Sequence, residues 1–236
     1  MRARLRACAP ALFAVAVLGA CNPAPEPASP PASARVARAL PSADLGEELR
    51  TFDRDVLERL RRQPDRRLLP EEREALAKGT TLNPPATATD LDALAARIGK
   101  PLPPSYRAFL AATNGMLYVA PLNVVTMHPA NAVAPFRPDD FPGIGIWLAM
   151  ADVAVPLEPA AGGPLPGRAL ARAWVISSVE DGDVYFIFPE LAGADGEWPV
   201  WFFGPKNPGA YGYRSFGDML ARERAPALRE LDRRGL

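Results

Sequence analysis

The pattern of apolar residues changes at Gly115, and this change most restricts the fold. Before Gly115, apolar side chains recur every three or four residues, as on one face of an α-helix; the longest such stripe is Leu45, Leu49, Phe52, Val56, Leu57 and Leu60. After it, six short runs are rich in β-branched and aromatic residues, as strands are: 117–119, 122–126, 144–148, 174–177, 184–188 and 198–203. Helices followed by strands are typical of the α+β class, with the helices packed on a mostly antiparallel sheet.

Start and stop signals predict where the helices lie. Proline suits a first helical turn, Thr87 with Asp90 forms a capping box, and glycine ends helices. We therefore expect helices from Ser42 to about Leu60, from Pro70 to Lys78, between Thr87 and Gly99, from Pro104 to about Asn114, and after the cap Ser215. In the fourth helix, the spacing predicts that Tyr106, Phe109 and Leu110 face the sheet.

Two Asp-Gly pairs separate predicted strands. Asp181-Gly182 and Asp195-Gly196 each lie between β-rich runs. A tight turn that needs positive φ selects this dipeptide, so the flanking strands should pair antiparallel. The glycine- and proline-rich segment 204–213 is expected to be an exposed loop.

The first 41 residues predict a signal peptide followed by a tether. Arg2, Arg4 and Arg6 precede an apolar run at 7–20 that is shorter than the roughly 20 residues of a membrane-spanning helix. The run ends in Leu18-Gly19-Ala20-Cys21, which resembles the lipobox of bacterial lipoproteins. This resemblance implies cleavage before Cys21 and lipidation of its thiol. The alanine- and proline-rich segment that follows should be an extended tether.

Cysteine usage limits the chemistry of the mature chain. The two cysteines are Cys8, in the predicted leader, and Cys21. Lipidation of Cys21 would leave no thiol for a disulfide, a metal site or a nucleophile. The lipoprotein resemblance, with Asn22 after the cysteine, implies an outer-membrane protein that faces the periplasm. The predicted organisation is a signal peptide at 1–20, a tether at 21–41, a helical extension at 42–81 and a domain at 82–236.

The net charge of the chain does not indicate a nucleic-acid partner. Lysine plus arginine equals aspartate plus glutamate at 27 each, so no broad basic field is expected. The region between the first two helices is locally basic, with Arg59, Arg61, Arg62, Arg66 and Arg67. These arginines form either a solvated face or a patch that contacts anionic lipid headgroups.

Catalytic signals are weak. His128 is the one histidine, and a triad with Ser177 or Ser178 and a nearby aspartate lacks the Gly-x-Ser-x-Gly turn of many serine hydrolases. One histidine without a free cysteine does not provide a zinc site. The carboxylates Asp139-Asp140 and Glu180 with its neighbours suit turns better than a glycosidase pair. Gly143-Ile144-Gly145 and Gly162-Gly163 lack the spacing of a phosphate loop. No cofactor is expected.

Several motifs together resemble a known family. Leu102-Pro103-Pro104-Ser105-Tyr106 and Thr113-Asn114-Gly115 are similar to the opening helix hairpin of the SUKH superfamily, Smi/Knr type. Three later motifs follow in that family's order: Asp181-Gly182-Asp183-Val184-Tyr185, Glu197-Trp198-Pro199-Val200-Trp201 and the segment from Ser215 to Leu220. The likeness spans about 82–220. It implies a protein-binding module, since many bacterial members resemble immunity proteins that bind and block a toxin.

The functional expectation is therefore a lipid-anchored, non-enzymatic binding module. Its expected partner is a protein, with a toxin as the candidate that the resemblance implies. Tyrosine and acidic side chains predict the partner-binding patch: Glu180, Asp181, Asp183, Tyr211 and Tyr213. Strand alternation would instead bury about half of the aromatic residues in the core. The alternatives are an envelope hydrolase that uses carboxylates and an envelope assembly scaffold.

Overall fold

The computed structural model describes residues 42–120, 123–141, 167–204 and 210–235. All of them belong to one compact unit, Ala37–Leu236. The α-helices are α1 (Ser42–Arg61), α2 (Pro70–Lys78), α3 (Ala88–Ile98), α4 (Pro104–Ala112), α6 (Gly167–Leu170) and α7 (Phe216–Arg234). Short 3-10 helices are η1 (Asp65–Arg67), η2 (Pro138–Asp140) and η3 (Pro189–Leu191). Across the described segments, no helix is long and apolar enough to cross a membrane.

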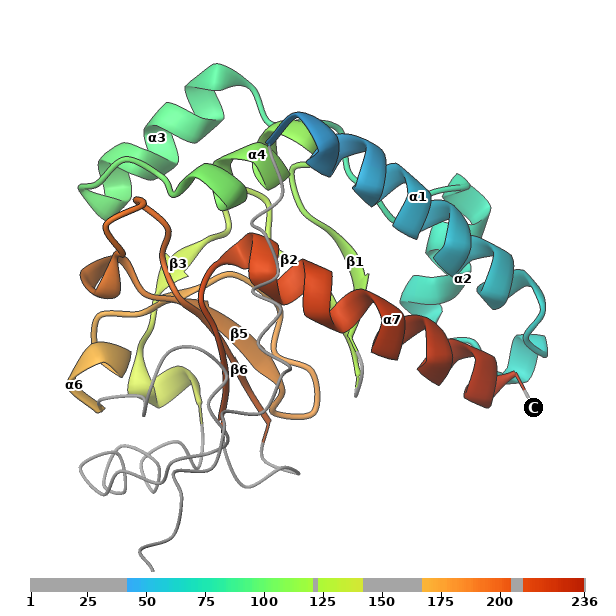
Figure 1. The fold of residues 1–236 in the computed structure, drawn as a ribbon. Helices are drawn as coiled ribbons and strands as arrows, with labels where there is room; N and C mark the ends of the chain where they lie inside the picture. Colours follow the sequence, from blue (N-terminus) through green and yellow to red (C-terminus); the bar gives the residue numbers. More distant parts are fainter. Residues whose placement is uncertain (1–41, 121–122, 142–166, 205–209, 236) are drawn as a thin grey trace, which may run out of the picture. The chain divides into compact units, whose positions relative to one another are not determined.

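The strands form two antiparallel sheets (Figure 1). They are β1 (Met116–Val119), β2 (Val124–Met127), β3 (Ala134–Pro135), β4 (Trp174–Val175), β5 (Val184–Ile187), β6 (Val200–Phe203) and β7 (Ala210–Tyr213). The first two pair as a hairpin, and the others form a sheet in the order β3-β4-β5-β6-β7. The α+β class and the antiparallel pairing across both Asp-Gly turns are confirmed.

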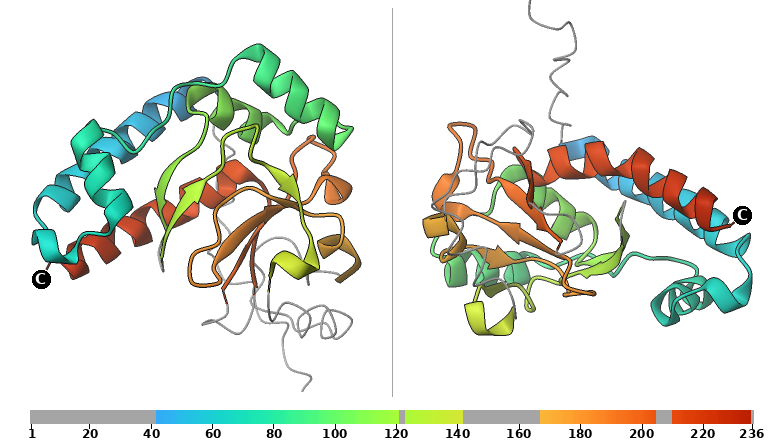
Figure 2. Two further views of the ribbon diagram at one scale, coloured as in Figure 1. Left: turned by 180° about the vertical axis from the view of Figure 1, so that it is seen from behind. Right: turned by 90° about the horizontal axis from the view of Figure 1, so that it is seen from below.

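Helices cover the sheets as a layer (Figures 1 and 2). The long helices α1 and α7 run side by side, and α1 also packs against α4. The predicted stripe of α1, apart from Leu57, is buried in the same core as the sheet residues Tyr185, Ile187 and Phe202. The helical extension and the sheet are thus stabilised by one hydrophobic core. A second, smaller core contains Phe136, Phe141, Phe186 and Trp201.

The predicted helix ends are confirmed by their caps. The Thr87 side chain accepts from the amide of Asp90 at 3.2 Å, and the Asp90 carboxylate accepts from the amide of Thr87 at 2.9 Å. Gly99 ends α3 with φ of 78°. Ser215 caps α7, because its hydroxyl oxygen accepts from the Asp218 amide at 3.0 Å.

The inward face of α4 is buried as expected. Tyr106, Phe109 and Leu110 are all at most 1% exposed. The ring of Phe216, at the start of α7, lies 4.6 Å from that of Phe109 and 5.0 Å from that of Tyr106. These aromatic contacts join the opening helix hairpin to the closing helix.

Two features of the fold were not predicted from the sequence. The predicted loop at 204–213 contains β7, a strand that pairs with β6 in register Trp201↔Gly212. A Cβ atom at Gly212 would lie 2.8 Å from the Trp201 ring, so the glycine that suggested a loop makes room for tryptophan. Helix α7 also continues past Pro226, although proline removes a backbone donor and usually ends a helix. The predicted strand 144–148 and the leader and tether, 1–41, lie outside the described residues.

Candidate functional site

The turn between β4 and β5 exposes two of the predicted partner-binding residues. Asp181 and Gly182 have φ of 55° and 88°. The flanking amides of Glu180 and Asp183 each donate to the other residue's carbonyl, at 3.1 and 2.8 Å, which holds a two-residue hairpin turn. Glu180 and Asp181 are exposed, and Val179 beside them is 45% exposed. We call Val179, Glu180 and Asp181 the acidic tip.

Two other members of the predicted patch, Asp183 and Tyr213, are less accessible than this tip. Asp183 is buried, and its carboxylate accepts from the Asn123 side-chain amide at 3.1 Å. Tyr213 is half-buried, with its hydroxyl directed at Glu223. Tyr211 belongs to β7, and its side chain lies outside the described residues. Among the four members whose side chains are described, Glu180 and Asp181 are the exposed ones, and the role of Tyr211 in the patch stays a prediction.

A buried carboxylate with three tyrosines lies beneath α7. The Glu223 carboxylate accepts from the hydroxyls of Tyr118 at 2.9 Å, Tyr185 at 2.7 Å and Tyr213 at 2.5 Å. The tyrosines come from β1, β5 and β7, so this cluster joins the closing helix to both sheets. We call these four residues the Glu223 cluster.

Burial dominates the proton equilibria of the Glu223 cluster. It raises the pKa of Glu223, because an ionised carboxylate loses hydration there, and the three tyrosine hydroxyls oppose this shift only in part. Burial raises the pKa values of Tyr118 and Tyr185 well above the usual range, and the neighbouring carboxylate adds to both shifts. Tyr118 and Tyr185 are therefore neutral donors at physiological pH, and the arrangement anchors α7 to the strands.

Sequence reasoning did not identify Glu223. The signal was present, because Phe216, Met219, Leu220, Glu223 and Ala227 share the buried face of a helix. The sequence prediction for this helix extends to Leu220, three residues before Glu223. The donors lie on three strands, and their sequence distance from Glu223 ranges from 10 to 105 residues. Local patterns alone do not bring such groups together.

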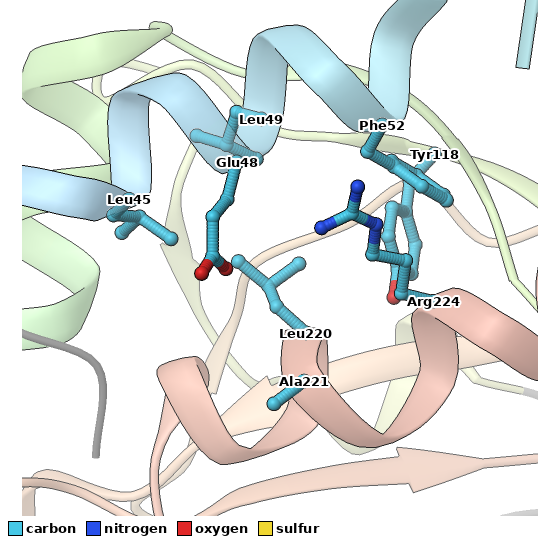
Figure 3. Close-up of a pocket in the computed structure, with 8 residues that line it drawn as sticks. All are labelled: Leu45, Glu48, Leu49, Phe52, Tyr118, Leu220, Ala221 and Arg224. Carbon is cyan, nitrogen blue, oxygen red and sulfur yellow. The ribbon is translucent and has the colours of Figure 1, made fainter. Parts of the chain in front are cut away.

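A cavity of about 200 Å³ lies between α1 and α7, beside the Glu223 cluster (Figure 3). Its lining is mainly apolar or aromatic: Leu45, Leu49, Phe52, Tyr118, Leu220 and Ala221. Two charged side chains, Glu48 from α1 and Arg224 from α7, complete it. Arg224 lies 3.8 Å from Asp55, and Glu48 is half-buried. Within the described part of the chain, Glu48 has no ion pair within 4 Å. We call this cavity the α1–α7 groove.

The two serines of the hypothetical triad make hydrogen bonds to the backbone. Ser177 is fully buried; its hydroxyl donates to the Ser178 carbonyl and accepts from the Tyr185 amide, both at 2.9 Å. The Ser178 hydroxyl oxygen accepts from the Thr126 amide at 2.9 Å. Burial lowers the pKa of His128, so its imidazole is neutral at pH 7. Both serines thus serve the strand pairing around β2, β4 and β5.

Two of the five arginines in the basic region between α1 and α2 contact the end of α7. Arg59 pairs with Asp232 at 3.0 Å, and Arg67 donates to the Arg234 carbonyl at 2.6 Å. Arg234 in turn donates to the fully buried Glu72 at 2.7 and 2.8 Å. Arg61, Arg62 and Arg66 are exposed, so a solvated face and a patch that contacts lipid headgroups both remain predictions for this region.

Comparison with known proteins gives the family. A model described as the SMI1 / KNR4 family (SUKH-1) matches residues 85–222, more than half of the chain. The chain belongs to this family. The match confirms the resemblance that the sequence motifs indicated over about 82–220. Neither a curated protein nor a solved structure matches the chain.

The family match ends one residue before Glu223 and excludes α1. The α1–α7 groove is therefore formed partly by elements outside the match.

Proposed function

We propose that this SUKH-family chain is a lipid-anchored immunity protein that binds a protein toxin and blocks it by contact. The observation that supports this most is the family match over 85–222. Proteins with this domain are generally immunity-type binding proteins without enzymatic activity. Ser177 and Ser178 make hydrogen bonds to the backbone, and His128 is partly buried. These environments agree with a binding role.

The acidic tip is the proposed contact surface. The two backbone hydrogen bonds of the turn fix its shape before binding, which lowers the entropy lost on association. Glu180 and Asp181 provide negative charge, and Val179 provides an apolar side chain between the strands and the turn. Opposite charge on a partner would speed its encounter and fix its orientation. The toxin is therefore expected to present a basic patch with an apolar centre.

The sequence supports the location of this activity. The lipobox-like segment ending in Cys21 would attach the mature chain to a membrane, and the tether at 22–41 reaches roughly 60 Å when extended at about 3.1 Å per residue. Such reach lets the domain intercept a toxin near the periplasmic face of the outer membrane. We propose that the tethered domain binds the toxin at this location.

A protection assay tests this proposal. The product of the gene beside this one is exported to the periplasm of a host that lacks this chain, with and without the full-length chain. We expect growth arrest without it and growth with it. Glu180→Lys with Asp181→Lys should abolish protection, whereas the matched control Asp139→Lys with Asp140→Lys, an exposed acidic pair in η2, should retain it. A neighbouring product that is harmless, or a tip variant that still protects fully, contradicts the proposal.

A further inference from the structure

The α1–α7 groove combines features that suit one class of ligand. Its volume of about 200 Å³ is below the roughly 300–1,000 Å³ of sites for drug-sized ligands, so its occupant is small. The leucines of α1 and Leu220 of α7 line an apolar interior. The half-buried Glu48 carboxylate lies at this interior without an ion pair inside the described segments (Figure 3). A carboxylate that lacks a cation beside an apolar hollow attracts a cationic group with an apolar body.

Aromatic side chains in the groove favour the same charge. The rings of Phe52 and Tyr118 lie 6.1 Å apart and both line the cavity. Aromatic faces attract ammonium groups electrostatically, and this attraction is stronger where water is excluded. Tyr118 is fixed at this position because its hydroxyl donates to Glu223. In Figure 3 Arg224 lies on the side of the groove where these rings are, whereas Glu48 lies toward Leu45, so the ammonium ion is assigned to the carboxylate and not to the rings.

Arg224 limits the number of positive charges that the ligand can carry. Its guanidinium faces the groove from α7 (Figure 3). The same group lies 3.8 Å from the Asp55 carboxylate. A second positive charge in the ligand would be repelled by Arg224, whereas an apolar tail would not. The groove thus favours one ammonium group over two.

We propose that the α1–α7 groove is a binding site for a small organic monoamine, whose ammonium group pairs with Glu48 and whose apolar body lies among Leu45, Leu49 and Leu220. This inference does not depend on toxin binding, because the groove and the acidic tip are formed by different elements. It assigns α1, which lies outside the family match, a role in ligand recognition.

Titration of the purified mature chain with four probes tests the site. Isothermal titration is combined with NMR of methyl-labelled leucines, using n-hexylammonium, 1,6-diaminohexane, n-hexanol and hexanoate. We expect n-hexylammonium to bind and to shift the methyl signals of Leu45, Leu49 and Leu220. The other three probes should bind at least tenfold more weakly. Equal binding of n-hexanol would show that charge is not recognised and would overturn the proposal.

Two isosteric variants locate the ammonium group. Glu48→Gln should weaken n-hexylammonium at least tenfold with an unchanged thermal midpoint. Glu47→Gln is the matched control, since this neighbouring glutamate is exposed and pairs with Arg50 on another face of α1. It should leave affinity unchanged. Absence of saturable methyl shifts, or equal loss in both variants, would overturn the proposal.

Discussion

Replacing Glu223 by alanine is expected to destabilise the protein by about 4 kcal/mol. The substitution leaves the hydroxyls of Tyr118 and Tyr185 without their acceptor, and both residues are 1% exposed. A buried hydroxyl without a partner costs about 1–3 kcal/mol, so two such groups alone account for about 4 kcal/mol near the middle of that range. The partly buried Tyr213 and the space left by the side chain add to the loss.

Urea unfolding followed by far-UV circular dichroism measures this loss. The matched control is Glu230→Ala on the same helix, which breaks only a surface ion pair with Arg233 and should cost less than about 1 kcal/mol. A loss below about 1 kcal/mol for Glu223→Ala would refute the account, because it would mean that water or other groups satisfy the tyrosines.

The pH dependence of Glu223→Gln gives a second measure of the same cluster. The pKa of Glu223 is raised in the folded state above its ordinary value of 4.5. Folding therefore favours the protonated acid, and the stability this contributes is complete below about pH 4.5 and is lost as pH rises through the folded-state pKa. Relative to the glutamine variant, the wild type should lose stability as pH is raised from 4 to 8. A relative gain with pH would show that the tyrosine hydrogen bonds outweigh burial.

Three further substitutions test separate parts of the account. Phe109→Ala should destabilise by about 3–5 kcal/mol in urea unfolding, the usual cost of emptying a buried aromatic site, and a change below about 1 kcal/mol would mean that α4 packs differently. Glu72→Ala should cost about 3 kcal/mol by the same measurement, because it leaves Arg234 without its buried partner at the end of α7; a neutral result would show that this contact does not hold the helices together. Cys21→Ala should release the protein or stall its processing, whereas intact-mass analysis of the wild type should show loss of residues 1–20 and added acyl mass; an unmodified, soluble wild type would disprove lipidation.

Much of the fold was predictable because its signals are local. Thr87 and Ser215 identify two helix starts through their own side-chain hydrogen bonds, and Gly99 identifies a helix end through its positive φ. Asp181-Gly182 likewise fixes an antiparallel turn. In each case the residues that carry the signal make the interaction themselves.

The features that were not predicted depend on distant neighbours. Gly212 weakens the strand signal of β7, yet it is required by Trp201 on the adjacent strand. Pro226 suggests an early end to α7, but the buried Ala227 and Leu231 keep the helix packed beyond it. Tertiary packing therefore overrides local preference at both positions.

The candidate site was predictable only in part for the same reason. Glu180 and Asp181 are exposed because their turn is a local structure. Asp183 is buried because Asn123, about 60 residues earlier in the chain, donates to it. The α1–α7 groove requires two helices from opposite ends of the chain, so no local motif predicts it.

Native mass spectrometry of the chain with the toxin identified in the protection assay tests the central claim most directly. The account predicts a stoichiometric complex in which both proteins keep their full covalent masses, and which the Glu180→Lys, Asp181→Lys variant fails to form. A toxin that is cleaved or modified without a stable complex would show that the chain acts by chemistry, and would contradict the proposal that it acts by binding.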